Sequence, residues 1–309
     1  MNGSPARKLL VLVGSTGSGK SETAIRLAQA LDGEIISADS RYLYRGLNIG
    51  TAKPTPDELT RVPHHLINVT TLDNPWSLGV YQKVAHHLIQ QINLRGHLPI
   101  LAGGTGQYVR AITEQWEIPA QAPEHQLRDA IALWGQRIGF DALHQRLARL
   151  DPEAAQFIDY RNKRRTIRAL EVIFSTGQRF SDQRKKSVSP YQQLIIGIAW
   201  PRELLYERID ARIDAMFAAG LVGEVQGLVE RGYAEVLKRM GIIGYSEVLQ
   251  YLDGKCSLEE AKEMIKHNTR VFVRRQANWF KANDPKIHWF NATDPAMLAH
   301  MLDLIKAVF

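Results

Sequence analysis

The sequence predicts an α/β fold with a P-loop-type parallel sheet, flanking helices and an inserted helical domain. A glycine-rich turn joins an apolar segment to a helical pattern near the N-terminus, and strand-like and helical segments then alternate as far as residue 116. This alternation is typical of a parallel sheet covered by helices. The stretch that follows has only helical patterns before apolar segments return. We therefore expect a core made of residues 1–116 and 193–309, the latter ending in helices, and a helical insertion at 117–192.

The individual elements follow from apolar periodicity and from turn residues. In the first core part we expect strands at 9–13, 34–37, 65–69 and 98–102, helices at 21–31, 77–94 and 107–116, and a long irregular loop at 41–63. In the insertion we expect helices at 126–138, 140–150 and 161–174. In the second core part we expect strands at 194–200 and 286–290, helices at 203–229 and 258–282, shorter helices between them and a terminal helix.

The composition is that of a globular protein, with 45% hydrophobic and 23% charged residues among 309. No apolar run is long enough to cross a membrane, and the apolar segment 9–13 is too short for a signal peptide. The single cysteine, Cys256, excludes an internal disulfide bond and fits a reducing compartment. We expect a cytoplasmic protein without a membrane partner.

The glycine-rich turn has the P-loop spacing G-x-x-x-x-G-K-S. Its glycines allow backbone N–H groups to converge on phosphate oxygens, and the helix that follows adds positive potential. Lys20 supplies a cation, and the Ser21 hydroxyl is a candidate ligand of Mg²⁺. An ordinary glycine turn is the alternative, but the complete motif between a strand and a helix favours a polyphosphate site. The predicted site comprises Gly14, Ser15, Thr16, Gly17, Ser18, Gly19, Lys20 and Ser21.

Other candidates follow predicted strands at the carboxyl edge of the sheet, where open α/β sheets bind ligands. Asp39 is a candidate general base or Mg²⁺ ligand, or else an aspartate that caps a turn. Thr105 offers a hydroxyl in a second glycine-rich turn. Arg208 and Arg212 share a helix face, where they either stabilise a leaving diphosphate or pair with surface acids. The strand at 98–102 lacks the terminal acid of a Walker B site, which argues against a motor-type ATPase.

Positive charge is concentrated in one window of the chain. The net charge is +7, and residues 161–186 contain nine Lys or Arg against two acids. An extended polyanion such as nucleic acid and a solvated basic helix both explain this window. The expected helix at 258–282 carries a second basic stripe, and two basic helices after a phosphate-binding core suit contact with an RNA backbone. The second stripe consists of Lys266, Arg270 and Arg274.

Several of these segments resemble the bacterial tRNA dimethylallyltransferases. The resemblance spans about residues 8–290, and the segment ISADSRYLYRGLNIGTAKPT is highly specific to that family. This sequence has Tyr42, Gln107 and Ser246 where the family commonly has a glutamine, an apolar residue and a basic residue. The matching stretches are GSTGSGKS (14–21), ISADSRYLYRGLNIGTAKPT (36–55), LAGGTGQYVRA (101–111), RRTIRALEV (164–172), IGYSEVLQYL (243–252) and TRVFVRRQANWF (269–280).

The resemblance implies transfer of a dimethylallyl group from dimethylallyl diphosphate to the exocyclic amine of the adenine just 3′ of the tRNA anticodon, which gives isopentenyladenosine and diphosphate. It implies that the P-loop binds the diphosphate with Mg²⁺ at Ser21, and that Asp39 takes the proton from the amine. Thr105 and Arg212, with Arg208 as the second choice, then stabilise the departing diphosphate. The insertion is expected to face the anticodon stem-loop of tRNA, and a monomer is expected. The implied tRNA-binding residues are Asp39, Ser40, Arg41, Tyr42, Arg128, Arg164, Arg165, Thr166, Ile167, Arg168, Gly244 and Tyr245.

Two other interpretations share the P-loop. An ATP-dependent kinase of a small molecule or nucleoside also uses a P-loop and an acid such as Asp39, but it does not explain the basic insertion. A non-catalytic RNA-binding protein switched by a nucleotide explains the basic residues. The absence of an N/T-K-x-D signature argues against a GTP switch.

Overall fold

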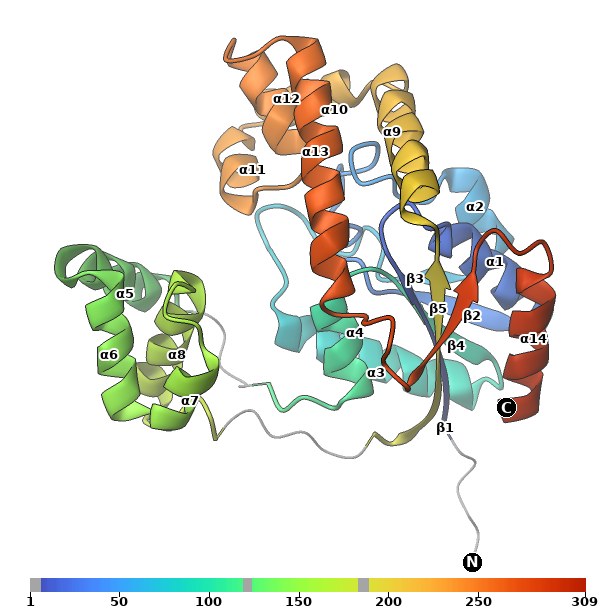
Figure 1. The fold of residues 1–309 in the computed structure, drawn as a ribbon, viewed down its shortest axis with the longest axis horizontal. Coiled ribbons are helices and arrows are strands. Elements are labelled where there is room, and N and C mark those ends of the chain that lie inside the picture. Colours follow the sequence, from blue (N-terminus) through green and yellow to red (C-terminus); the bar gives the residue numbers. More distant parts are fainter. Residues whose placement is uncertain (1–6, 119–123, 183–188) are drawn as a thin grey trace, which may run out of the picture. The chain divides into compact units, whose positions relative to one another are not determined.

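A six-stranded parallel sheet forms the centre of the core (Figure 1). The structure is a computed structural model, and it describes residues 7–118, 124–182 and 189–309. The strand order is β3-β2-β4-β1-β5-β6, and every neighbouring pair runs parallel. The strands are β1 (Arg7–Gly14), β2 (Gly33–Ser37), β3 (His64–His65), β4 (Leu98–Ala102), β5 (Tyr191–Ala199) and β6 (Ile287–Asn291).

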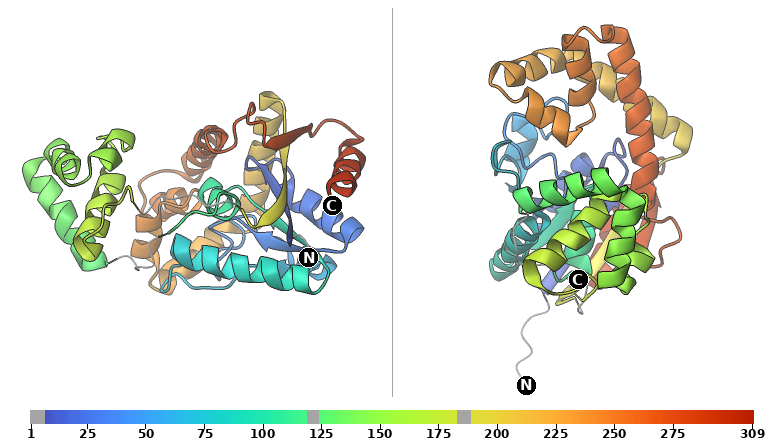
Figure 2. Two further views of the ribbon diagram at one scale, coloured as in Figure 1. Left: turned by 90° about the horizontal axis from the view of Figure 1, so that it is seen from below. Right: turned by 90° about the vertical axis from the view of Figure 1, so that its left-hand side faces the viewer.

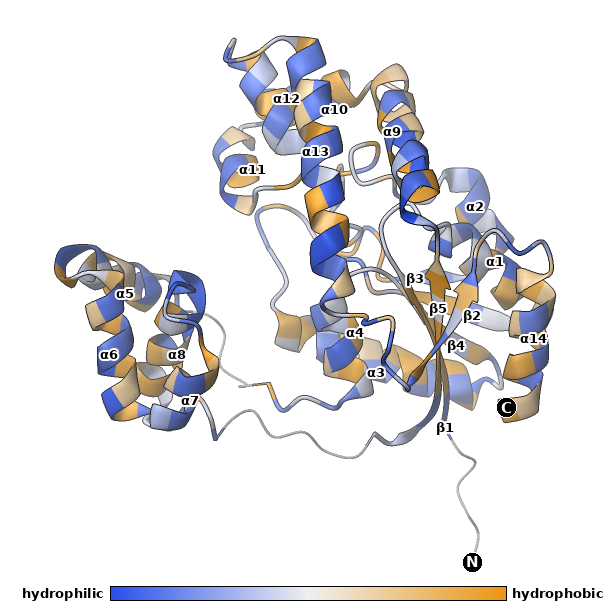
Figure 3. Cartoon of the chain, in the orientation of Figure 1, coloured by the Kyte–Doolittle hydropathy of each residue, from blue (hydrophilic) through white to orange (hydrophobic). Residues whose placement is uncertain are grey.

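Burial on both faces explains why the central strand β1 is continuously apolar from residue 9 to residue 13. Residues 9–13 of β1 have 0% exposed surface, and β1 pairs with β4 on one side and β5 on the other. Such strands lack polar alternation because neither face meets water. Figure 3 shows hydrophobic residues concentrated in the strands, whereas the helices carry both kinds of residue.

Helices cover the two faces of the sheet (Figure 2). On one face, α1 (Lys20–Leu31) and α14 (Met297–Val308) pack on alternate side chains of the strands, such as Leu10 and Leu12. On the other, α3 (Leu78–Leu94) is joined to β1 by Asn93, whose side chain bonds to both backbone groups of Lys8. The short helix α4 (Gly106–Thr113) follows β4.

The expected helix at 203–229 is two helices. It divides into α9 (Arg202–Ala218) and α10 (Leu221–Glu230) because Gly220, with φ +95°, adopts a conformation that no α-helix contains. These helices pack with the three that follow (Figure 1). The three are α11 (Ala234–Met240), α12 (Tyr245–Leu252) and α13 (Leu258–Ala277).

The segment between β2 and α3 differs from expectation in two places. The expected strand at 65–69 ends after His65, because Leu66 and Asn68 have left-handed φ values of 62° and 56°. The expected loop at 41–63 contains a short helix, α2 (Pro56–Arg61). Thr55 and Glu58 form a capping box at its start, a signal that is present in the sequence.

A second compact unit has its own hydrophobic core. It comprises residues 77–81 and 114–189, whereas residues 191 and 192, which we expected in the insertion, begin β5. Its core includes Leu143, Leu147 and Leu170. The short helix α7, between the expected helices, begins after Asp151, whose side chain accepts a hydrogen bond from Ala154 N. The helices are α5 (His125–Ile138), α6 (Phe140–Leu150), α7 (Pro152–Phe157) and α8 (Lys163–Thr176). None of the helices in the described parts of either unit is long and apolar enough to cross a membrane.

Candidate active site

The carboxyl ends of three adjacent strands bring the predicted catalytic segments together. Leu12 of β1 and Ser37 of β2 both pair with Ala102 of β4, so the three strands end level with one another. The P-loop follows β1, the turn 103–106 follows β4, and Asp39 follows β2. Because β4 lies between β1 and β2, the turn that contains Thr105 lies between the P-loop and Asp39.

The P-loop has the backbone geometry that its glycines predict. Gly17 and Gly19 have left-handed φ values of 81° and 86°, and Gly19 caps α1 without a side chain. The Lys20 ammonium donates a hydrogen bond to Ser15 O at 2.6 Å, so it lies over the loop. The Ser18 hydroxyl is buried, and its oxygen has no hydrogen-bond partner among the described residues. An unpaired buried hydroxyl costs free energy, and a ligand oxygen in the loop offers it a partner.

Helix α9 brings both predicted arginines to this edge of the sheet. Arg208 donates from Nε to Gly17 O at 3.2 Å, and Arg212 donates from Nη2 to Thr51 O at 3.2 Å. Neither arginine forms an ion pair within the part of the chain that the structure describes. The Arg208 guanidinium also lies 4.3 Å from the centre of the Trp200 ring, and the Trp200 indole donates to Ser18 O at 3.0 Å. Cationic groups therefore flank the loop, as expected if they neutralise a phosphate.

Hydrogen bonds from its own turn orient the Asp39 carboxylate. Oδ1 accepts from Arg41 N at 2.9 Å, so Asp39 does cap a turn, as the alternative interpretation states. In the described residues no group donates a hydrogen bond to Oδ2, which leaves that oxygen free to accept a hydrogen bond from a ligand. The neighbouring Ser40 N donates to Thr105 Oγ1 at 3.0 Å and so joins the Asp39 turn to the Thr105 turn.

The electrostatics of the site identify a single cluster of charged groups. Burial lowers the pKa of Lys20 to about 8, while the Asp39 carboxylate raises it and the Arg212 guanidinium lowers it. Burial raises the pKa of Tyr42 to about 12, and both Asp39 and Arg212 act on that hydroxyl as well. The charges of Asp39 and Arg212 therefore both act on Lys20 and on Tyr42, which places the four groups in one neighbourhood.

Comparisons with known proteins show the family of the chain. The family model described as IPP transferase matches residues 42–283. A tRNA dimethylallyltransferase of Roseiflexus sp. (strain RS-1) is 48% identical over 273 residues, which cover 88% of this chain and 90% of the relative. One of Thermomicrobium roseum is 42% identical over 300 residues, with 97% and 91% covered. The chain belongs to the tRNA dimethylallyltransferase family. Members of this family are prenyltransferases that modify tRNA.

Solved structures show the same fold. The tRNA isopentenylpyrophosphate transferase of Bacillus halodurans superposes with a TM-score of 0.72 at 38% identity, with 98% of this chain and 96% of that chain covered. A eukaryotic dimethylallyltransferase acting on tRNA superposes with a TM-score of 0.81 at 27% identity, with 97% of this chain and 77% of that chain covered. The P-loop-type α/β fold expected from the sequence is thereby confirmed.

The family resemblance also implied tRNA contacts, and the structure divides these residues into exposed and buried ones. Arg164 and Arg165 on α8 are exposed, and neither forms an ion pair with another described residue. Thr166 and Ile167 are 1% and 9% exposed, and Tyr245 is 0% exposed. These three buried side chains are not available to tRNA, so only their backbone groups remain as candidates.

Arg128 and Arg168, two of the implied tRNA contacts, form ion pairs with the buried Glu171. Arg128 donates from both Nε and Nη2 to Glu171 Oε2, at 2.9 and 2.8 Å, and Arg168 lies 2.9 Å from Oε1. Burial alone raises the pKa of Glu171, but the hydrogen bonds from the two arginines outweigh it and hold the pKa below its ordinary value. This arrangement joins α5 to α8 inside the insertion, so these charges support structure.

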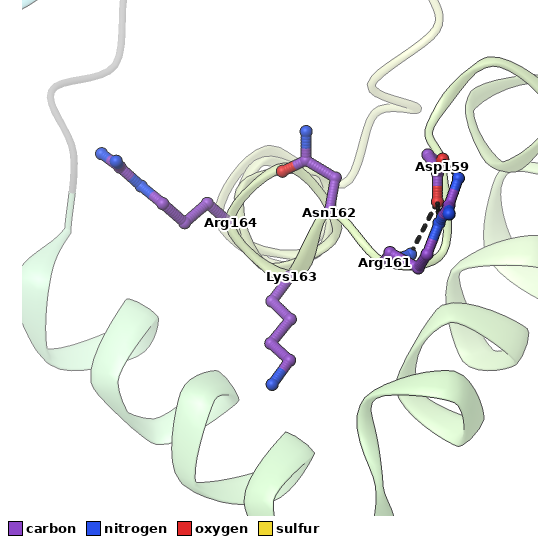
Figure 4. A pocket seen from close by; sticks show the side chains of 5 residues that line it. All are labelled: Asp159, Arg161, Asn162, Lys163 and Arg164. Atoms are coloured by element: carbon purple, nitrogen blue, oxygen red, sulfur yellow. Dashed lines mark hydrogen bonds and ion pairs between the residues drawn. The ribbon is translucent and has the colours of Figure 1, made fainter. Parts of the chain in front are cut away.

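Two basic residues at and just before the start of α8, Arg161 and Lys163, also have partners (Figure 4). Arg161 pairs with Asp159 at 2.6 Å, and Lys163 lies 4.5 Å from the centre of the Phe140 ring. In Figure 4 Arg164 projects from the helix in a different direction from Lys163. On α13, the expected basic stripe also has partners: Lys266 pairs with Asp214, and Arg270 pairs with Asp210. Basic residues 184–186 lie outside the described residues.

Glu224, which was not among the predicted site residues, holds the loop at residues 48–50 in place. Glu224 on α10 accepts hydrogen bonds from three consecutive backbone N–H groups, those of residues 48, 49 and 50, at 2.8–3.1 Å. The Tyr245 hydroxyl also donates to Glu224, at 2.6 Å. The one available signal is that Glu224 is a lone acid in the apolar segment LVGEVQGLV.

Lys53, in the same loop, was also missed as a structural residue. Its buried ammonium donates to Tyr44 O, Asn48 Oδ1 and Asn68 Oδ1, at 2.7–3.1 Å. Three donors and three acceptors satisfy the group completely. Burial nevertheless lowers the pKa of Lys53 to about 8. Lys53 and Glu224 together determine the path of the chain directly after Asp39 and Tyr42.

The residues at the P-loop fit a magnesium ion that is bound chiefly by its substrate. Ser21 is exposed on the first turn of α1, and no group of three or more His, Cys, Asp or Glu side chains in the described residues could hold a metal alone. Mg²⁺ ordinarily keeps several waters and takes its remaining ligands from substrate phosphates and one or two side chains. A hydroxyl beside a phosphate cradle meets that requirement.

Proposed function

We infer that the protein transfers a dimethylallyl group from dimethylallyl diphosphate to the exocyclic amine of the adenine 3′-adjacent to the anticodon in tRNA. The observation that carries this inference is the level edge of β1, β4 and β2, where a phosphate cradle, a hydroxyl and an oriented carboxylate follow adjacent strands. An allylic diphosphate ionises readily once its leaving group is neutralised. An aromatic amine is a weak nucleophile, which a carboxylate assists by accepting its proton.

Each group of the site then has a part in the reaction. Lys20, Arg208 and Arg212 balance the charge of the diphosphate as it leaves, and Thr105 donates a hydrogen bond to it. We propose Ser21 as a Mg²⁺ ligand, and a bound Mg²⁺ further neutralises the leaving group. The Oδ2 oxygen of Asp39 accepts the amine proton. Because all of these residues come from one chain, we propose that the protein acts as a monomer.

A transfer assay separates this function from its alternatives. Labelled dimethylallyl diphosphate and bulk tRNA are incubated with the protein, and ATP replaces the labelled donor in a parallel tube. Label that enters tRNA and yields isopentenyladenosine supports the transferase. Hydrolysis or transfer of the ATP γ-phosphate, with no label in tRNA, would establish a kinase or a nucleotide switch.

Binding of inorganic diphosphate is expected to take up protons above pH 8. The pKa of Lys20 is about 8 in the free protein, and a bound anion raises it. Between those two values the lysine becomes charged on binding, so affinity falls as pH rises through this range. Calorimetry at pH 7 and pH 9, in buffers of different ionisation enthalpy, measures the uptake. The control is Lys20→Arg, whose guanidinium does not titrate. Equal uptake by the two proteins at pH 9 would contradict the assignment.

Charge reversal at Arg164 and Arg165 is expected to weaken tRNA binding. Both side chains are exposed and lack ion pairs within the described residues, so they remain available to phosphates. We expect affinity to fall about tenfold or more, and the dependence of log affinity on log salt to become shallower by about one unit per arginine. Filter binding at several salt concentrations measures both quantities. The control variant is Arg137→Glu with Arg149→Glu, which reverses two exposed charges on α5 and α6. Equal effects of the two double variants would show that only net charge matters.

A further inference from the structure

The buried amide of Gln276 connects the P-loop to the Thr105 turn. Gln276 lies in the last turn of α13 and is 4% exposed. Its Oε1 accepts a hydrogen bond from Thr16 N at 2.9 Å, and its Nε2 donates to Gly104 O at 3.0 Å. The orientation of the amide is therefore determined by its partners, because an N–H requires an acceptor and a carbonyl requires a donor.

The turn at Gly104 is adapted to this side chain. A Cβ atom at position 104 would lie 2.4 Å from Gln276 Nε2, closer than any real contact. A side chain at position 104 would therefore displace the Gln276 amide from its hydrogen bonds. The close approach of the amide accounts for the glycine, because the backbone at this position is not left-handed. The next residue, Thr105, accepts a hydrogen bond from Ser40 N. A continuous series of contacts therefore runs from the P-loop through Gln276 to the Asp39 turn.

The helix that carries Gln276 is also joined to the helix that carries the arginines. Arg270 of α13 pairs with Asp210 of α9, and Lys266 lies 3.5 Å from Asp214 of α9. Arg208 and Arg212 are on this same helix α9. The position of α13 therefore bears on three parts of the site: the P-loop, the Thr105 turn and the arginine pair.

We propose that Gln276 is a positioning residue that holds the P-loop and the Thr105 turn at the separation which a bound diphosphate bridges. This proposal rests on the function proposed above. The Thr16 N–H donates to Gln276 Oε1, so this N–H is already paired and the amide fixes the position of the loop at Thr16. Removing the amide leaves the Thr16 N–H and the buried Gly104 carbonyl without partners, and the two turns become free to separate.

Gln276→Met tests this proposal, because methionine has a similar length and no hydrogen-bonding amide. We expect KM for dimethylallyl diphosphate and Kd for inorganic diphosphate to rise about tenfold, as the loss of two buried hydrogen bonds implies. The Kd for tRNA without the donor is expected to stay within about twofold, which is the scatter of a neutral change. The matched control is Gln250→Met on α12, where the glutamine is exposed. A purely structural role would lower the melting temperature and leave the KM of the folded enzyme unchanged.

Gln276→Glu supplies a second test, which remains valid if the methionine variant fails to fold. A protonated glutamate accepts from Thr16 N and donates to Gly104 O as the amide does. An ionised glutamate loses the donor and adds a negative charge beside the diphosphate. We therefore expect kcat/KM of the Gln276→Glu variant to fall further below that of the parent as pH rises through the pKa of the new carboxyl group. A KM for the donor equal to that of the parent in both variants, at every pH, would overturn the proposal. Failure of the parent itself to bind diphosphate would instead refute the proposed function.

Discussion

Asp39→Asn is expected to slow dimethylallyl transfer by roughly 10²- to 10⁴-fold, the usual contribution of a general base, while tRNA binding is retained. Asparagine keeps the Oδ1 acceptor that Arg41 N uses, so the turn keeps its geometry. It replaces the oxygen that accepts the proton with an amide nitrogen that has no such capacity. The change therefore separates the two roles of this residue, capping its turn and taking a proton.

Single-turnover transfer with labelled donor measures the chemical step, and filter binding measures affinity for tRNA. The matched control is Asp57→Asn on α2, an exposed aspartate in the first turn of its helix. Transfer at the rate of the parent would remove Asp39 as the base. Loss of tRNA affinity in parallel with rate would show instead that Asp39 serves mainly to bind the substrate.

Glu224→Ala is expected to destabilise the protein by about 2–4 kcal/mol and to lower its melting temperature by roughly 5–10 °C. The carboxylate satisfies three backbone N–H groups and the hydroxyl of the fully buried Tyr245. Glu224 is an acceptor for all four of these donors, so truncation of its side chain removes that acceptor from each of them. The loop that follows Asp39 then loses its contact with α10, so transfer activity is expected to fall with stability.

Thermal unfolding measures this effect. Glu230→Ala, at the exposed end of the same helix, is the matched control and is expected to change the melting temperature by little. Glu224→Gln is expected to be intermediate, because one oxygen remains while the new amide nitrogen faces donors. A melting temperature of Glu224→Ala equal to that of the control would show that water replaces the carboxylate without cost.

The strands and the P-loop were predictable because their signals are local. The apolar run at residues 9–13 leads directly into a glycine-rich turn, which identifies it as a buried strand, and the spacing from Gly14 to Ser21 is itself the structural motif. The segment 41–63 was less predictable. Its path depends on Glu224, which lies more than 170 positions away in the sequence. No periodicity in a segment reveals a partner so distant.

The charges of the insertion show the same limit. The count of basic residues in 161–186 was compatible with a polyanion-binding surface and with a solvated basic helix, but Arg168 pairs with Glu171, as does Arg128 of α5. The sequence shows Glu171 as one of two acids in that window and does not show that it is buried. A charge count therefore does not distinguish paired from unpaired basic residues. Within the described part of the window, Arg164 and Arg165 are exposed arginines without an ion pair.

The order of the strands has a consequence for how the protein is made on the ribosome. Strand β1 is synthesised long before β5, which begins at Tyr191 and is one of the two neighbours of β1 in the sheet. The nascent chain must therefore carry an open strand edge through much of translation, a state that favours intermolecular pairing. The P-loop reaches its final hydrogen bonding later still, because the Thr16 N–H can bond to its acceptor only when Gln276 has left the exit tunnel.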